Sequence, residues 1–168
     1  MARLFALDQN FPQPIVAALG RFQADATLVP VGAIDPRLSD VEDWELLLAL
    51  HHHQDPWDGL VTTDTRMLRQ GPELAVLLQT KLTLVSTRAS GNNPVKASGL
   101  LFAYLDGICS RTDPGKAQVW ALNSAQRPAA DPWDLLESVA KHQHRDTTDL
   151  YEECRLSDAQ LAIDPLAG

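Results

Sequence analysis

The chain has 168 residues, of which 45% are hydrophobic and 21% are charged, and its formal net charge is −8. This length and composition indicate one ordinary globular domain and exclude a disordered chain. The negative charge excludes a general attraction to nucleic acid, so any such contact would be local or supported by bound metal. Two cysteines exclude a disulfide framework and favour a reduced, cytoplasmic protein. No stretch approaches the roughly 18 apolar residues of a membrane span, so we expect no membrane partner.

Hydrophobic spacing predicts strands that alternate with helices along most of the chain. In chain order, we expect a strand at 3–7, a helix at 15–22, a strand at 27–31, a helix at 39–53, a strand at 60–63, a helix at 66–78 with a break near residues 71–72, a strand at 82–86, a helix at 95–108, a strand at 118–122 and a helix at 132–142, with short helices near 148–154 and 157–162. Ser39 and Glu42 have the spacing of a capping box, so we expect Ser39 to be an N-cap.

This alternation is typical of an α/β fold with a parallel, doubly wound sheet. We expect residues 1–122 to form that domain. Residues 123–130 have the composition of a linker, and the remaining tail is too short for a core of its own. We therefore expect residues 123–168 to be a helical C-terminal extension that packs on the domain or on a partner.

Acidic residues stand at related places in this pattern. Asp8 follows the first predicted strand, Asp64 follows the third, and Asp43 opens the helix between them, with Asp40 one turn earlier. The carboxyl ends of parallel strands meet at one edge of a sheet, where open α/β sheets bind their ligands. Carboxylates gathered there repel one another, and a hard divalent cation with oxygen ligands relieves that repulsion. The pattern therefore predicts a metal-dependent site.

Each of these residues also has a simpler structural interpretation. An aspartate after a strand is often the N-cap of the next helix, and an aspartate in a first helical turn interacts favourably with the helix dipole. We expect one of Asp40 and Asp43 to serve only that purpose. Arg66 either contacts a phosphate or neutralises the acidic cluster. Three consecutive histidines, residues 51–53, cannot share one helix face. We therefore interpret them as a structural feature of a helix C-terminus, where the helix dipole favours histidine.

Three motifs in order resemble the PIN-like superfamily. They are LDQNFP at residues 7–12, SDVEDWELLLA at 39–49 and LVTTDTRML at 60–68. In particular they resemble the small branch whose chains begin LDENLP and continue with a VTTD strand end, related to the VapC-type toxin nucleases. The resemblance covers about residues 1–90 and extends at most to residue 122. It implies a three-layer α/β/α sandwich with a central parallel sheet, and a Mg²⁺- or Mn²⁺-dependent phosphodiesterase site that cuts RNA.

The resemblance also implies roles for individual residues. Asp8, Asp43 and Asp64 correspond to acids that bind the metal and serve catalysis, and Asp40 is close enough to replace Asp43. Asn10 matches a polar residue often found two places after the first acid. A fourth acid would fall near the end of the fourth strand, where residues 86–88 contain no carboxylate.

Basic and polar residues near the same edge suit a phosphate. Arg66 follows Asp64 by two positions, and Arg88 follows the fourth predicted strand, so both could contact phosphate oxygens. Lys96 and the turn at residues 91–93, which opens a helix, add further donors.

These observations lead to three hypotheses of function. The first is a metal-dependent nuclease, in particular a ribonuclease, which could be the toxin of a toxin–antitoxin pair. Its partners would be RNA, an antitoxin-like protein and a second copy of the chain. The second is a PIN-like binding or scaffold module without catalysis, which the missing fourth acid and the additional tail favour. The third is a receiver-type signalling domain with Asp64 as phosphate acceptor, although Gln9 stands where receivers usually carry a second acid.

Overall fold

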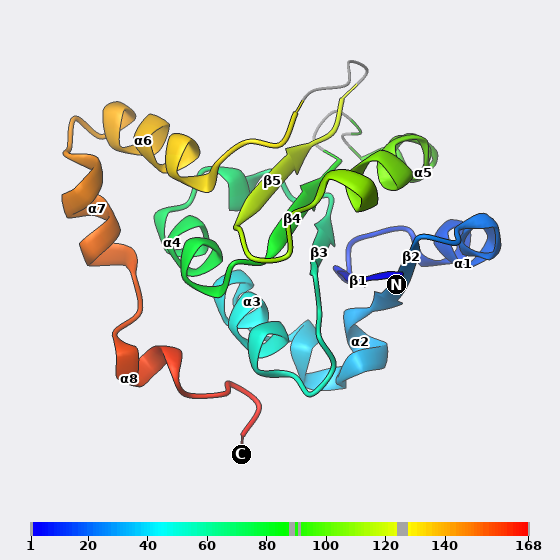
Figure 1. Cartoon of the computed structure of the whole chain (residues 1–168), viewed down its shortest axis with the longest axis horizontal. Coiled ribbons are helices and arrows are strands. Elements are labelled where there is room, and N and C mark those ends of the chain that lie inside the picture. Colours follow the sequence, from blue (N-terminus) through cyan, green and yellow to red (C-terminus); the bar gives the residue numbers. More distant parts are fainter. Residues whose placement is uncertain (1, 88–89, 91, 124–127, 168) are drawn as a thin grey trace.

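A five-stranded, all-parallel sheet forms the centre of the molecule (Figure 1). The computed structural model describes residues 2–87, 90, 92–123 and 128–167. The strands are β1 (Arg3–Leu7), β2 (Ala26–Pro30), β3 (Gly59–Thr62), β4 (Thr83–Ser86) and β5 (Gln118–Ala121). Their spatial order is β2-β1-β3-β4-β5. The predicted parallel α/β fold is therefore confirmed, and the strands lie within about one residue of their expected positions.

Helices cover both faces of the sheet. They are α1 (Gln13–Leu19), α2 (Val31–Ile34), α3 (Asp43–His52), α4 (Gly71–Thr80), α5 (Pro94–Arg111), α6 (Pro132–His142), α7 (Thr147–Cys154) and α8 (Asp158–Leu161). Short 3-10 helices lie at Gly20–Phe22 (η1), Pro36–Ser39 (η2) and Arg66–Leu68 (η3). No helix of the described residues is long and apolar enough to cross a membrane.

The core has two halves because side chains alternate along each strand. On one face, α3 and α4 pack against Ala6, Leu60, Leu84 and Val119. On the other face, α1 and α5 pack against Phe5, Leu7, Val61, Val85 and Trp120. Burial on both faces explains why the strands are nearly continuous apolar runs, as parallel sheets require.

The helix that carries the candidate acid begins later than the sequence suggested. The prediction that Ser39 is its N-cap is wrong, because residues 36–39 form the 3-10 helix η2 instead. Asp35 caps that turn by accepting a hydrogen bond from the backbone N–H of Arg37 at 2.9 Å. Helix α3 then starts with Glu42 as N-cap, in a capping box with Glu45. Asp43 is therefore the first residue of α3.

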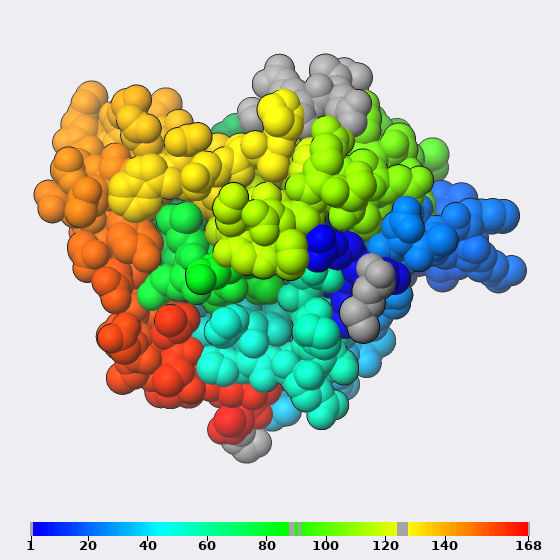
Figure 2. Space-filling view, viewed as in Figure 1, coloured from blue at the N-terminus to red at the C-terminus, as the bar shows by residue number. Residues whose placement is uncertain are grey.

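The C-terminal extension packs on the domain. Leu136 and Ala140 of α6 and Leu150 of α7 form a buried cluster with Leu74 of α4. The end of α8 lies against α3, because the carbonyl oxygen of Leu161 is 2.7 Å from Nε2 of His52. Figure 2 shows the tail, in orange and red, lying along one side of the molecule. The preceding segment also pairs with the sheet, since Val119 and Ala130 form an antiparallel bridge.

Candidate functional site

The strand order places a crevice between the ends of β1 and β3. From β1 the chain moves to β2 on one side and returns to β3 on the other side of β1. Connections that leave in opposite directions open a crevice at the carboxyl edge of a sheet, and ligands of α/β proteins bind there. Asp8 directly follows β1, and Asp64 follows β3 by two residues. The two acids therefore flank the switch point of the fold.

A threonine hydroxyl links these two acids. Asp8 is 7% exposed, and its Oδ2 accepts a hydrogen bond of 2.8 Å from Oγ1 of Thr62, the last residue of β3. The same oxygen of Thr62 accepts a bond of 2.9 Å from the backbone N–H of Asp64. Thr62 is fully buried. It therefore orients the Asp8 carboxylate and the start of the Asp64 loop at once.

A Thr62→Val variant is expected to be destabilised by about 1–3 kcal/mol, because valine keeps the shape but leaves a buried carboxylate and a backbone N–H without this partner. Thr62→Ser keeps the hydroxyl and loses only one methyl group, so it should lose less, about 1 kcal/mol. Urea denaturation of the three proteins measures the difference. Equal stability of the two variants would contradict the linking role.

Arg66 engages the Asp64 carboxylate. Its Nη2 and Nε donate to Oδ2 at 2.6 and 2.9 Å, and its backbone N–H donates to Oδ1 at 2.7 Å. The hydrogen bonds from Arg66 hold the pKa of Asp64 below its usual range. The Arg66 side chain is nevertheless 76% exposed. Asp35 and Arg37 form the same arrangement elsewhere, so an Asp-x-Arg turn folds this way without a functional site.

The charges of Asp8 and Asp64 also affect the third acid, Asp43. It is partly buried at the start of α3. Burial and then the negative charges of Asp8 and Asp64 raise the pKa of Asp43, while Arg66 opposes the shift. Asp40 is exposed and ends η2, and its charge is not among those that raise the pKa of Asp43. Of the two candidates, Asp43 is the one whose pKa responds to the charges of Asp8 and Asp64.

The raised pKa of Asp43 predicts a pH dependence. The folded protein holds this proton more tightly than the unfolded chain, so Asp43 contributes stability at low pH. That contribution is lost as the pH rises through the raised pKa. Without divalent metal, the stability of Asp43→Asn minus that of the wild type should therefore grow as the pH rises from about 4 toward neutrality. Urea midpoints at several pH values measure this difference, and a constant difference would contradict the assignment.

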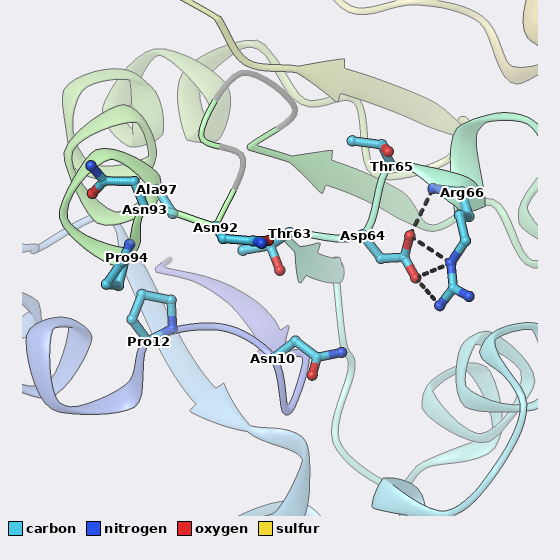
Figure 3. A pocket seen from close by; sticks show the side chains of 10 residues that line it. All are labelled: Asn10, Pro12, Thr63, Asp64, Thr65, Arg66, Asn92, Asn93, Pro94 and Ala97. Atoms are coloured by element: carbon cyan, nitrogen blue, oxygen red, sulfur yellow. Dashed lines mark hydrogen bonds and ion pairs between the residues drawn. The ribbon is translucent and has the colours of Figure 1, made fainter.

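A hollow of about 760 Å³ opens beside Asp64. Asp64 and Arg66 line it from the loop after β3, Asn10 lines it from the loop after β1, and Asn92 and Asn93 line it from the start of α5 (Figure 3). Asn93 also caps α5, because its side chain accepts a hydrogen bond of 3.0 Å from the backbone N–H of Lys96. Three separate loops thus present polar side chains to one space.

The end of β4 contributes hydroxyl groups to this region. Ser86 and Thr87 are fully buried, and Oγ of Ser86 makes no hydrogen bond to any residue that the structure describes. The fourth acid of the resemblance has no counterpart at these two positions. Arg88, the second expected phosphate contact, lies outside the described residues.

Glu73 is an acid that the sequence analysis missed. It is the third residue of α4 and only 8% exposed. Burial and the charges of Asp43, Glu42 and Asp64 raise its pKa, against a hydrogen bond from its own backbone N–H. Its place after Gly71-Pro72, at a helix start behind the β3 loop, was a usable signal. The spacing of the three motifs gave no reason to include it.

The carboxylate side chains suit a divalent cation, but they do not form a complete metal-binding site. Carboxylates are the ligands that Mg²⁺ and Mn²⁺ prefer, and a cation would relieve the repulsion that raises the pKa of Asp43. Among residues 2–87, 90, 92–123 and 128–167, however, no three His, Cys, Asp or Glu side chains are placed to hold one ion. Both carboxylate oxygens of Asp64 are engaged by Arg66. Shared binding by Asp8, Asp43 and Asp64 would require Arg66 to release Asp64.

Comparison with known proteins gave no match to this chain, whether with family models, with curated proteins or with solved structures.

Proposed function

We propose that the chain is a PIN-like, divalent-cation-dependent phosphodiesterase that cleaves RNA. The observation that carries this proposal is the electrostatic coupling of Asp43 to Asp8 and Asp64 at the switch point of the sheet. Carboxylates whose pKa is shifted by burial and by neighbouring charges in a crevice are candidates for a functional site. The three ordered motifs at residues 7–12, 39–49 and 60–68 support the same assignment.

The proposal gives each residue a part in the chemistry. Asp8, Asp43 and Asp64 would hold Mg²⁺ or Mn²⁺, which supplies an activated water and stabilises charge on the phosphate. Thr62 keeps Asp8 oriented. Asn10 lies where it can position substrate in the hollow, because it lines the same space as Asp64.

Arg66 is proposed to contact a phosphate of the RNA. Its exposed guanidinium lines the hollow, and an incoming phosphate offers an alternative to the Asp64 carboxylate. Transfer of Arg66 to the phosphate would free Asp64. The net charge of −8 favours such a local contact over a broad basic surface, and it also leaves room for a basic antitoxin-like partner or for a homodimer.

An Arg66→Ala variant should bind single-stranded RNA more weakly, and the slope of log K against log salt should fall by about 0.7, the value for one lost phosphate contact. Arg37→Ala is the matched control, because Arg37 forms the same turn away from the hollow. Binding measured by fluorescence anisotropy without divalent metal checks this. Equal slopes for the two variants would leave Arg66 with a neutralising role only.

A second candidate function is a catalytically silent PIN-like binding or scaffold module. The engagement of both Asp64 oxygens by Arg66 favours it, as does the lack of a preformed three-ligand group among the described residues. Such a module would bind RNA or a partner protein without cleavage.

One experiment separates the two functions. Mn²⁺ is titrated into the wild type and into the Asp8→Asn/Asp64→Asn double mutant, while thermal stability and cleavage of a mixed RNA pool are followed. Stabilisation and cleavage in the wild type, both lost in the mutant, support the nuclease. Stabilisation without cleavage supports the silent module, and no metal response in the wild type would overturn the proposed cation site.

A further inference from the structure

A second hollow, of about 550 Å³, adjoins the hollow beside Asp64. Thr65 lines both of them, and Figure 3 shows this residue next to Asp64 and Arg66. We call the second hollow the α6 groove, because it is bounded by Leu68 of η3, Val119 of β5 and Val139 of α6. Helix α6 belongs to the C-terminal extension, so the extension forms a wall of a groove that meets the candidate site at Thr65.

Helix α6 packs on the domain with one face and lines the α6 groove with another. Leu136 and Ala140 are fully buried in the cluster with α4. Leu135, Val139 and His142 line the α6 groove, and their spacing of four and three residues places them on one side of the helix. Leu135 and Val139 are only half-buried. Mostly apolar walls with a few polar groups, in a hollow of this size, are typical of a ligand-binding site.

Arg69 gives the α6 groove a positive charge. It is exposed and lines the groove, and it forms no ion pair with any residue that the structure describes. Its backbone N–H donates to the carbonyl oxygen of Arg66 at 2.8 Å and closes the 3-10 turn η3. Residues three apart in such a turn lie about 6 Å apart along its axis. Two arginines are therefore held at a fixed spacing, with Arg66 at one hollow and Arg69 at the other.

A strand of RNA suits this combination of groups. Its phosphates repeat along the backbone, and each bears a negative charge that an arginine neutralises. Its bases have apolar faces and polar edges, and proteins bind them by covering the faces and by hydrogen bonds to the edges. The α6 groove offers apolar walls for a face, and it offers the imidazole of His142 and the amide of Gln143 for an edge. A purely apolar ligand would leave Arg69 without a partner.

We propose that the α6 groove binds the RNA nucleotide next to the one in the hollow beside Asp64, with its base against the apolar wall of α6 and its phosphate on Arg69. This inference rests on the proposed function, because it takes RNA as the ligand. It gives the C-terminal extension, which none of the three sequence motifs includes, a part in binding the substrate.

The first part of the test measures how salt affects binding of a short single-stranded RNA to the full chain without divalent metal. Arg69→Ala should lower the slope of log K against log salt by about 0.7, and the Arg66→Ala/Arg69→Ala double variant should lower it by about 1.4, the values for one and two lost phosphate contacts. Arg21→Ala is the matched control and should keep the wild-type slope. Arg21 is also an exposed arginine of a 3-10 helix, but that helix, η1, precedes β2 at the opposite edge of the sheet from β5.

The second part of the test fills the α6 groove. Val139→Trp places a large side chain in the groove, whereas Glu137→Trp, the matched control, places it on the same helix at a position that does not line the groove. The RNA carries an abasic site at each position in turn. At one position, loss of the base should weaken binding to the wild type and to the control about fivefold or more, and it should have no effect on binding to Val139→Trp. Circular dichroism controls for folding, and the Arg69→Ala slope does not depend on this variant.

The outcomes separate this inference from the proposed function. If Arg66→Ala lowers the slope and Arg69→Ala does not, RNA contacts only the hollow beside Asp64, so the inference is overturned and the proposed function stands. Equal sensitivity of Val139→Trp and the wild type to every abasic site would also overturn it. If both parts give the expected result but Mn²⁺ supports no cleavage, the inference holds for a silent RNA-binding module. A wild type that binds no RNA would remove the proposed function and this inference together.

Discussion

Gly59→Ala is expected to destabilise the protein by on the order of 3 kcal/mol or more. Gly59 begins β3, which lies between β1 and β4 in the middle of the sheet. A Cβ at this position would lie 1.9 Å from the carbonyl oxygen and 2.7 Å from the carbonyl carbon of Thr83. These are backbone atoms of β4, so no side-chain rotation relieves the overlap. The two strands would have to separate where they begin to pair.

The matched control is Gly99→Ala, because a Cβ on Gly99 meets no other group within 4 Å. Gly99 is exposed within α5, and alanine there should stabilise the helix by about 1 kcal/mol. Denaturation in urea with circular dichroism measures both variants. A Gly59→Ala protein as stable as the wild type would mean that β3 and β4 do not approach as closely as described.

The second large effect is expected at Asp43. Asp43→Asn should lower Mn²⁺-dependent RNA cleavage on the order of 100-fold, whereas Asp40→Asn should leave it within about twofold of the wild type. The expected difference follows from where the two aspartates lie. The charges of Asp8 and Asp64 contribute to the raised pKa of Asp43, while Asp40 is exposed and directly follows η2. Loss of Asp43 removes a proposed ligand of the cation.

Initial cleavage rates of a labelled RNA at saturating Mn²⁺ measure both variants, and circular dichroism controls for folding. Both substitutions replace an aspartate by asparagine within four positions of each other, so they match in chemistry and in region. Equal loss of activity in the two variants would contradict the assignment of Asp43, and loss only in Asp40→Asn would reverse it.

Much of the fold follows from local sequence pattern. The apolar runs at residues 3–7, 60–63 and 82–86 are short, continuous and bounded by polar residues, which identifies buried parallel strands without any knowledge of their order. The prediction of Ser39 as an N-cap was wrong because residues 35–45 offer more than one possible N-cap. Asp35 and Glu42 cap successive turns, and the burial of Leu38 in the core favours that solution.

The residues of the candidate site also differ in whether the sequence alone predicts them. The positions of Asp8 and Asp64 after strands can be predicted from the sequence alone, because both residues follow apolar runs. Those runs form strands that end at the same edge of the sheet. Thr62 was not identifiable, because its significance depends on a partner far along the chain. Thr62 matters through its bond to Asp8, 54 residues away. Glu73 had a local signal in the helix start after Gly71-Pro72, but its burial and the charges around it are known only from the structure.

The sequence by itself determined the α/β class, the strand positions and the acids at strand ends, because periodicity and local turn chemistry depend on neighbours in the chain. Only the tertiary structure decided the strand order, and with it the crevice between β1 and β3. It also distinguished Asp43 from Asp40 and revealed the burial of Glu73. Burial and charge coupling are properties of residues brought together from distant segments, so they arise only when the chain packs.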